Sequence, residues 1–229
     1  PVWEPEDPSC VGCKGHVYSR SRVADSMRRQ GLRSKVRRKF VVTTDTKHDL
    51  KASPNLLNRQ FEADYPNQVW VTDITYLKSR AGWLFLVVFI DLFSRRVVGW
   101  SVSPSLGHET VLMALSRAVW QRRPDPGLMI HSDRGVQYCC DGFREVIHTH
   151  QFVQSMSRKA NCWDNAVAES FFRTLKTEWL YHIELIDQEH AQRELFAYIE
   201  MFYNHQRLHA TLDYVAPDAF ERLRTRKVA

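Results

Sequence analysis

Long hydrophobic runs are absent from this sequence. No apolar stretch approaches the roughly 18 residues that a membrane-spanning helix needs, and no charged segment followed by an apolar one precedes a small-residue cleavage site. Internal repeats and low-complexity tracts are lacking as well. These absences predict a soluble protein of the cytoplasm. The chain begins with Pro1 where a Met is usual, which indicates a fragment or a missing start.

Cysteine is scarce, and its number is odd. The cysteines occur without any sign of secretion, which predicts reduced thiols instead of disulfides. Cys10, Cys13 and His16 follow a spacing that a zinc site could use. A lone Cys-x-x-Cys pair without a second, similarly spaced pair is weak evidence, so a structural zinc is the less favoured alternative. The five cysteines are Cys10, Cys13, Cys139, Cys140 and Cys162.

Acidic residues are few near the start of the chain. Residues 1–60 hold 13 Lys+Arg against 6 Asp+Glu, and the remainder holds 19 against 20. The net charge of +6 therefore comes entirely from the first 60 residues. Between Arg20 and Lys39, nine basic residues alternate with apolar ones at near-helical spacing, which predicts a basic helix over 19–40. Such a helix suits phosphate contacts, but a solvated basic face explains the charge equally well. The candidate DNA contacts here are Arg28, Arg29, Arg37 and Arg38.

The rest of the chain has the composition of a compact domain. A length of 229 residues with 44% hydrophobic content suffices for one sizeable core and an appendage. Residues 41–68 are polar and contain Pro54 and Pro66, so we predict a basic, partly helix-turn-helix-like region with its linker over 1–52 and a compact domain over 53–229.

Apolar patterning within that domain predicts its elements. Three closely connected apolar runs predict an antiparallel meander, and the elements after it alternate between helix and strand. The expected fold is therefore α/β, with a mixed five-stranded sheet flanked by helices. The predicted strands are 69–77, 83–91, 95–102, 127–133 and 152–156, and the predicted helices are 108–123, 140–150, 164–182 and 187–206.

Three acidic residues occupy unusual places in this pattern. Asp73 lies within an otherwise apolar strand, Asp133 ends the fourth strand, and Glu169 lies on the helix after the fifth. A carboxylate buried in a strand is costly without a partner such as a cation, although a single acid of this kind is as often a hydrogen-bonded structural residue. Together the three form an oxygen-rich set that hard ions such as Mg²⁺ or Mn²⁺ prefer. Two such ions can support in-line phosphoryl transfer.

The spacing of these acids resembles the DDE superfamily of transposases and retroviral integrases. There are 59 residues between Asp73 and Asp133, 35 between Asp133 and Glu169, and Lys176 follows seven positions beyond the glutamate. The closer resemblance is to the catalytic, second-frame (OrfB) subunit of the insertion-sequence-three family, and it extends over about 54–220. It is carried by "WVTDITYL", "VVFIDLFSRRVVGW", "HSDRGVQY", "SMSRKANCWDNAVAESFFRTLKTE" and "FYNHQRLHATLDYVAPDAF".

The resemblance implies both a fold and a reaction. It implies an RNase H-like core in which Asp73, Asp133 and Glu169 hold two divalent ions, Mg²⁺ or Mn²⁺. The implied reaction cleaves DNA at the ends of a mobile element and leaves a 3′-hydroxyl, which attacks another phosphodiester without a covalent protein–DNA intermediate. It also implies a first-frame (OrfA) partner, a homo-multimer on paired DNA ends, and association with the nucleoid when DNA is bound.

The helix that carries Glu169 presents two faces. Glu169, Arg173 and Lys176 share one of them, and the resemblance implies that Lys176, with Arg173 beside it, contacts DNA near the site. Asp164 falls near the start of this helix, where capping or loop ordering is favoured over metal binding. The opposite face predicts core packing by Ala168, Phe172, Leu175 and Trp179.

Several other polar residues have structural and functional alternatives. Asp91 is expected to pair with Arg95 or Arg96 in preference to a metal. His131 lies two residues before Asp133 and is expected to be a satisfied core histidine, with substrate contact as the alternative. A last group either contacts DNA or closes the last helix before Pro217, and the sequence does not separate these roles. It comprises Asn204, Arg207 and His209.

Two departures from the family pattern leave rival functions open. Residues 19–50 resemble the latter half of a helix-turn-helix segment, but residues 1–18 do not match what should precede it, as a truncated, frameshifted or mis-started reading would explain. Asp213 stands where the family commonly has glycine. The favoured function is a metal-dependent transposase subunit. The alternatives are an RNase H-like nuclease that only hydrolyses, and an inactive DNA-binding remnant of a transposase.

Overall fold

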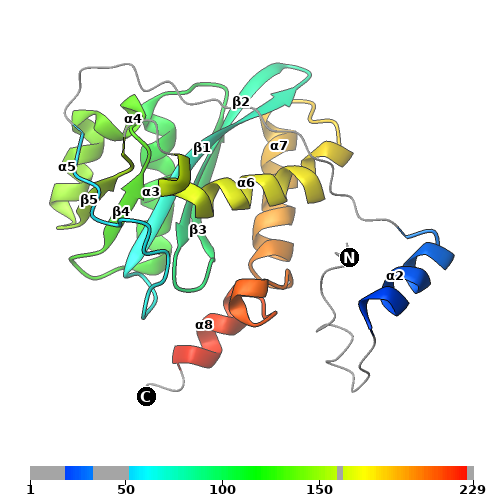
Figure 1. Cartoon of the computed structure of the whole chain (residues 1–229). Helices are drawn as coiled ribbons and strands as arrows, with labels where there is room; N and C mark the ends of the chain where they lie inside the picture. The colour runs from blue at the N-terminus through cyan, green and yellow to red at the C-terminus, as the bar shows by residue number, and fades with distance from the viewer. Residues whose placement is uncertain (1–18, 33–51, 159–161, 226–229) are drawn as a thin grey trace.

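A five-stranded sheet organises the protein, as the computed structural model shows (Figure 1). The structure describes residues 19–32, 52–158 and 162–225. The strands lie in the order β3-β2-β1-β4-β5. β1 pairs antiparallel with β2 and β2 with β3, whereas β1 and β4, and β4 and β5, run parallel. This arrangement confirms the predicted mixed sheet, with the meander first and the parallel strands after it.

The meander follows from three apolar segments joined by short turns. β1 (Val69–Ser79) and β2 (Gly82–Asp91) are joined by a tight turn at which Gly82 has a φ of 130°, a value that favours glycine. β3 (Val97–Ser103) returns beside β2 at the edge of the sheet. The pairing places Asp73 opposite Val88, in the middle of the β1–β2 ladder.

The parallel half is built from short strands with helical crossovers. β4 (Met129–Ser132) and β5 (Val153–Met156) are both four residues long. α3 (His108–Arg122) leads from β3 to β4, while α4 (Val136–Cys139) and α5 (Asp141–Thr149) lead from β4 to β5. α3 lies close against β3 because Gly99 lacks a side chain: a Cβ there would stand 2.5 Å from the Ala114 carbonyl oxygen.

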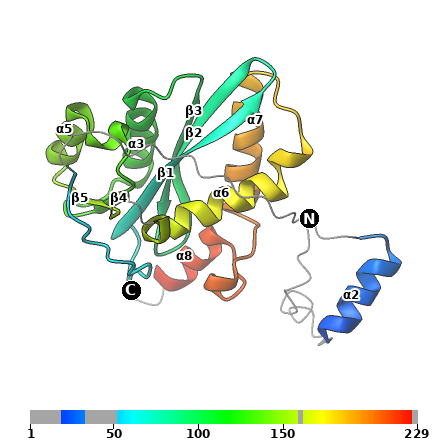
Figure 2. The same ribbon diagram turned by 45° about the horizontal axis from the view of Figure 1, so that its top comes forward.

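The sheet buries a hydrophobic layer on each face. On the side of α3 and α5, the core contains Trp70, Phe89 and Ile130, all fully buried. On the other side, α6 (Ala166–Glu178) and α7 (Gln188–Phe196) cover a core that includes Val71 and Val88. Figures 1 and 2 show α6 crossing the sheet on the side of α7. Because side chains alternate along a strand, Asp73 shares the face of Val71, which is the face beneath α6.

The helices after β5 are more interrupted than the pattern predicts. In place of one helix over 164–182, a 3-10 helix (Cys162–Asn165) precedes α6, and a second one (Leu180–His182) follows it. α7 continues as a π-helix (Ala197–Tyr203). A further helix, α8 (Pro217–Thr225), was not predicted from the sequence, and it begins with a proline at a position where a helix tolerates one.

The basic segment forms a shorter helix than expected within the described residues. α2 (Arg20–Arg29) begins at Ser19, whose side chain accepts the Arg22 N–H, and gives way to a turn at Gly31 with a φ of 69°. The rest of the predicted basic helix, from residue 33 on, lies outside the described residues. Among the helices that the structure describes, none has the length and apolarity to cross a membrane.

Candidate active site

Asp73 sits where a strand carboxylate is poorly accommodated. It is partly buried in β1, and its Oδ1 accepts the N–H of Ile74 at 2.8 Å. Burial raises the pKa of Asp73 well above its usual value, and the negative charges of Asp133 and Glu169 raise it further. The Ile74 hydrogen bond and the positive charge of Lys176 act in the opposite direction. Asp73 is therefore the centre of a group of interacting charges.

Asp133 follows the end of β4, the strand next to β1, and lies at the same level of the sheet as Asp73. β1 and β4 run parallel with Val71 beside His131, so Asp73 and Asp133 each lie two residues further in the same direction. Asp133 Oδ1 accepts the N–H of Gly135 at 2.9 Å, which shapes the turn after β4. A Cβ at Gly135 would stand 3.0 Å from that same oxygen, so a residue without a side chain suits the turn.

Glu169 lies on α6, which covers the face of the sheet that carries Asp73. It lies in the first turn of α6 and is exposed, and partial burial of its carboxyl raises its pKa. Its charge contributes less than that of Asp133 to the raised pKa of Asp73. In the part of the chain that the structure describes, no three His, Cys, Asp or Glu side chains are grouped closely enough to hold a metal ion as they stand.

Contacts between α6 and β1 position Glu169 and Lys176. Asn165, just before α6, donates from Nδ2 to the Thr72 carbonyl oxygen at 3.2 Å, next to Asp73. Lys176 donates from Nζ to Thr75 Oγ1 at 2.7 Å, on the same strand face as Asp73. Burial lowers the pKa of Lys176, and attraction to Asp73 opposes this.

The two faces of α6 follow the sequence pattern, with one difference. Ala168, Phe172 and Leu175 are buried, as predicted, while Trp179 is only half-buried at the end of the helix. Trp179 instead donates from Nε1 to Glu194 Oε2 at 3.0 Å. On the other face, Arg173 is exposed.

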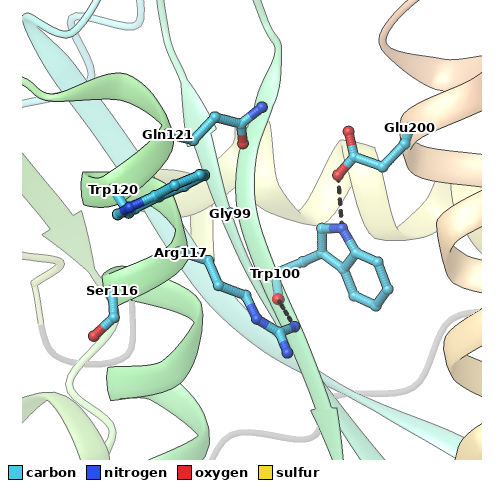
Figure 3. A pocket seen from close by; sticks show the side chains of 7 residues that line it. All are labelled: Gly99, Trp100, Ser116, Arg117, Trp120, Gln121 and Glu200. Atoms are coloured by element: carbon cyan, nitrogen blue, oxygen red, sulfur yellow. Dashed lines mark hydrogen bonds between the residues drawn. The ribbon is translucent and has the colours of Figure 1, made fainter.

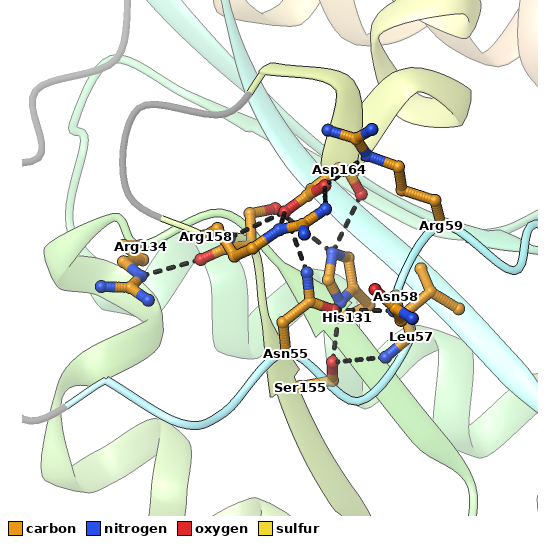
Figure 4. Close-up of polar contacts among 10 residues, drawn as sticks. Asn55, Leu57, Asn58, Arg59, His131, Arg134, Ser155, Arg158 and Asp164 are labelled. Atoms are coloured by element: carbon orange, nitrogen blue, oxygen red, sulfur yellow. Dashed lines mark hydrogen bonds and ion pairs between the residues drawn. The ribbon is translucent and has the colours of Figure 1, made fainter.

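Asp164 organises the chain around the start of α6 (Figure 4). It is fully buried and accepts the backbone N–H of Arg158 and two hydrogen bonds from its guanidinium, at 2.8 to 2.9 Å. Arg59 Nε and Asn55 Nδ2 donate to it at 2.9 Å each. These donors, the Arg158 hydrogen bonds first, hold the pKa of Asp164 well below its usual range.

The predicted loop-ordering role of Asp164 is thereby confirmed, but helix capping is not. Asn165, not Asp164, is the N-cap residue of α6, and its side chain makes no capping bond. The carboxylate of Asp164 instead joins the segment before β1 to the loop after β5, through partners more than 100 residues apart from it in the chain.

His131 is a satisfied core histidine, as predicted. It is fully buried, with Nδ1 2.8 Å from Ser155 Oγ and Nε2 3.0 Å from the Asp164 carbonyl oxygen. Ser155 Oγ already accepts the N–H groups of Leu56 and Leu57, so its own hydrogen points at Nδ1. The imidazole is therefore neutral and donates from Nε2, and burial lowers its pKa to about 4.

The expected partner of Asp91 is wrong. Asp91 is fully buried and accepts the N–H groups of Asn67 and Phe93 at 2.7 and 2.8 Å, with Arg122 as its ion-pair partner at 3.6 Å. Burial raises its pKa to about 6. Arg95 instead donates to the Phe61 carbonyl oxygen, and Arg96 pairs with Asp218.

Residues near the end of the core have structural partners. Asn204 is fully buried and exchanges hydrogen bonds with the backbone of Val97 at 3.0 Å. Arg207 forms a fork with both carboxylate oxygens of Glu178, at 2.6 to 3.1 Å. His209 packs edge-on against Tyr203, and burial lowers its pKa to about 3. Of the two predicted alternatives, these contacts favour the structural one.

Tyr138 interacts with the charges of Asp73 and Asp133, and this role was not predicted from the sequence. It is fully buried on α4, and its hydroxyl lies 3.0 Å from Thr72 Oγ1, beside Asp73. Burial raises its pKa well above the usual value, and the charges of Asp133 and Asp73 add to this. In the sequence, its proximity to the acids was indicated only by its position five residues after Asp133, in "HSDRGVQY".

An open hollow elsewhere on the surface contains none of the three acids (Figure 3). It lies between β3, α3 and the π-helix, where Trp100 Nε1 donates to Glu200 Oε1 at 2.9 Å and Arg117 Nη1 donates to the Trp100 carbonyl oxygen at 3.0 Å. The exposed ring of Trp120 forms part of its wall. The hollow is therefore not part of the site formed by the acids.

The remaining candidates belong to the N-terminal region. Arg28 and Arg29 are exposed on α2, and Arg28 donates to Asp25 at 2.8 Å. Five candidates lie outside the described residues: Arg37, Arg38, Cys10, Cys13 and His16.

Comparisons with known sequences identify close relatives. The chain matches the family described as integrase core domain over residues 63–162 and again over 150–217. It is 42% identical over 208 residues to transposase InsF for insertion sequence IS3A of Escherichia coli (strain K12), covering 91% of this chain and 72% of the relative. It is 41% identical over 206 residues to an uncharacterized 31 kDa protein of insertion element IS600 from Shigella sonnei, covering 90% and 76%.

Solved structures share the fold at low identity. A chain of the simian T-cell lymphotropic virus intasome in complex with PP2A regulatory subunit B56 gamma superposes with a TM-score of 0.59 at 16% identity, covering 94% of this chain and 74% of that one. The HTLV-2 integrase catalytic core domain in complex with magnesium (trimeric form) gives 0.53 at 17% identity, covering 69% and 97%. These likenesses confirm the RNase H-like fold of retroviral integrase cores.

Proposed function

Because the chain belongs to the family of insertion sequence IS3 transposases, we propose that Asp73, Asp133 and Glu169 together form its catalytic, metal-binding site. The chain is a DNA transposase with an integrase-like catalytic core, and its family implies polynucleotidyl transfer. The observation that carries the assignment of residues is the parallel register of β1 and β4, which pairs Val71 with His131 and so brings Asp73 and Asp133 to the same level beneath α6, the helix of Glu169. The raised pKa of Asp73, to which burial and the charges of Asp133 and Glu169 contribute, agrees with it.

The chemistry of these side chains fits divalent cations. Carboxylate oxygens are the ligands that Mg²⁺ and Mn²⁺ prefer. The charges of Asp133 and Glu169 raise the pKa of Asp73, and the positive charge of Lys176 offsets only part of that effect. A bound cation would lower the pKa of Asp73 and relieve the cost of its burial. Glu169 is exposed, so its side chain can change rotamer when an ion binds.

We propose that two ions bind here and that the reaction has two steps. When bound, such ions activate an attacking hydroxyl and stabilise the leaving oxygen of an in-line displacement. In the first step water breaks a phosphodiester at the element end and releases a 3′-hydroxyl; in the second, that hydroxyl attacks a target phosphodiester and displaces another 3′-oxygen. The residues of the chain orient the DNA: Lys176 and Arg173 on α6 stand beside the acids and would contact its phosphates.

The proposed partners follow from the same assignment. DNA ends and target DNA are the substrates, with Arg28 and Arg29 of α2 as further phosphate contacts within a basic region over 1–52 and the core over 53–229. Arg37 and Arg38 belong to this proposal by sequence alone. The simian virus neighbour is named as part of an intasome, and we propose that this chain likewise acts as a homo-multimer on paired ends, together with a first-frame OrfA partner.

Strand transfer on DNA carrying the element ends, with Mg²⁺, tests the assignment. Asp133→Asn removes one ligand charge while conserving shape, and should abolish strand transfer but retain DNA binding. Asp141→Asn is the matched control, because Asp141 is a fully exposed acid on α5 and should be dispensable. Equal activity of wild type and Asp133→Asn would refute the proposed site.

A further inference from the structure

We propose that Arg158, held beside Arg59 by the buried carboxylate of Asp164, binds a phosphate of the DNA strand that passes the catalytic acids. The identity of the ligand as DNA rests on the proposed function, whereas the site itself rests on the contacts of three side chains. These side chains lie together in Figure 4.

The site is built around one carboxylate and two guanidinium groups. Asp164 is fully buried, yet both of its arginine partners reach the surface: 44% of the Arg59 side chain and 47% of the Arg158 side chain are exposed. A single arginine suffices to neutralise a buried carboxylate. Arg158 forms that pair through two of its nitrogens, and nearly half of its side chain still lies at the surface.

The orientation of Arg158 is set in advance. Its Nε and Nη2 donate to the two oxygens of Asp164 at 2.9 and 2.8 Å, and its backbone N–H donates to the same carboxylate at 2.9 Å. The guanidinium plane is therefore fixed through Nε and Nη2, while 47% of the side chain remains exposed. A planar, preoriented donor edge matches the geometry of a phosphate and loses little entropy on binding.

The location places such a phosphate beside the catalytic acids. Arg158 follows the end of β5, and Asp133 follows the end of the adjacent, parallel β4. Arg134 joins these two ends, because its Nε donates to the Ser157 carbonyl oxygen at 2.7 Å. Asp164 itself precedes α6, which carries Glu169, and its carbonyl oxygen accepts from His131 on β4.

Arg158 and Lys176 together would hold a DNA strand on both sides of the acids. Without bound cations the three acids repel a DNA backbone, so the strand has to be held by positive charges on either side of them. Lys176 stands on one side, along α6, and the Arg158 site stands on the other, at the ends of β4 and β5. A phosphate contact of this type is independent of base sequence.

The first test measures DNA affinity of the full chain without divalent metal, so that it does not depend on catalysis. Arg158→Gln should weaken binding of a short fluorescein-labelled duplex roughly tenfold at low salt, and should reduce the slope of log affinity against log salt by about 1. The double variant Arg158→Gln with Asp164→Asn leaves the net charge of the chain unchanged and avoids stranding a buried carboxylate. It should show the same loss.

Arg193→Gln is the matched control, because Arg193 is an exposed arginine on α7 that also pairs with an acid, Glu189. Wild-type affinity and salt slope in both Arg158 variants would overturn the proposal, as would an equal loss in Arg193→Gln. The loss should be the same for an element-end duplex and a scrambled one, and a loss confined to the end sequence would contradict a phosphate contact.

A second measurement uses the wild-type protein and so does not depend on a variant that folds. DNA should protect Arg158 from modification by phenylglyoxal, read by mass spectrometry, while Arg193 remains reactive. Equal modification of Arg158 with and without DNA would overturn the proposal. If Asp133→Asn retained strand transfer, the catalytic assignment would fail while both of these binding measurements still decided the Arg158 site.

Discussion

The buried imidazole of His131 makes the stability of the protein sensitive to mild acid. Its Nδ1 accepts from Ser155 and its Nε2 donates to Asp164, so a second proton has no acceptor in the folded protein. The pKa of His131 is about 4 in the folded state, whereas a histidine in the unfolded chain has a pKa of about 6.5. The unfolded chain therefore takes up a proton that the folded chain does not, and this favours unfolding as the pH falls below about 6.5.

The size of the effect follows from the difference between the two pKa values. Proton linkage gives a loss of about 2 kcal/mol in unfolding free energy by pH 5 and about 3 kcal/mol by pH 4, relative to neutral pH. Urea unfolding of wild type and His131→Gln at neutral pH, pH 5 and pH 4 measures it. The variant is less stable at neutral pH, but its decline toward pH 4 should be smaller than that of wild type by this amount.

The comparison isolates one residue, since other titrating groups are common to both proteins. His108→Gln, at an exposed histidine, controls for loss of an imidazole as such. If wild type and His131→Gln lose stability in parallel between neutral pH and pH 4, the neutral, doubly bonded imidazole is wrong.

Three further perturbations test other parts of the structure. Asp73→Asn should stabilise the metal-free protein at neutral pH, and this gain should vanish below about pH 4, where the aspartate is protonated in both states; urea unfolding in EDTA measures it. Glu178→Gln breaks the buried ion pair with Arg207 and the hydrogen bond from Tyr198, and should lower the unfolding free energy by about 3 kcal/mol in the same assay. A loss below about 0.5 kcal/mol would contradict a stabilising role of this ion pair. Lys176→Met removes a charge that lowers the pKa of Asp73, so strand transfer should fall roughly tenfold and the acidic limb of its pH profile should move to higher pH; an unmoved limb would contradict the contact.

Much of the fold was predictable because its apolar runs are long and continuous. The meander strands are bounded by short turns, and the observed β1 and β2 match the predicted ranges closely. The parallel half was predictable from the alternation of helix and strand. The π-helix was not, because its backbone bonds, such as that from the Asn204 N–H to the Ile199 carbonyl oxygen, span one residue more than those of the α-helix that apolar spacing predicts.

The expected ion pair of Asp91 was wrong because it was chosen from residues close in the sequence. Asp91 is four and five residues from Arg95 and Arg96, yet the chain reverses between them, with Arg95 at a φ of 59°. That turn sends both arginines toward other segments, and Asp91 meets Arg122 from the end of α3. Ion pairs that join distant segments follow from the fold, and one sequence does not contain that information.

The acids that we propose as catalytic could be selected from the sequence, but their surroundings could not. Asp73 and Asp133 are recognisable because a carboxylate in or at the end of a buried strand is unusual. Asn55 and Arg59 are more than 100 residues away from Asp164 in the chain, and Tyr138 is 66 residues away from Thr72, which its hydroxyl contacts. The two acids of "DNAVAE" therefore differ in their surroundings: Asp164 is buried among several hydrogen-bond donors, whereas Glu169 is exposed on α6.

Anomalous diffraction from crystals of the full chain grown with Mn²⁺ would locate the ions that we propose at the three acids. Manganese peaks should be bonded to the carboxylates of Asp73 and Asp133, with Glu169 turned toward the same ions. Ordered manganese elsewhere, or a well-ordered Glu169 that points away from both aspartates while the ions are bound, would contradict the proposed site.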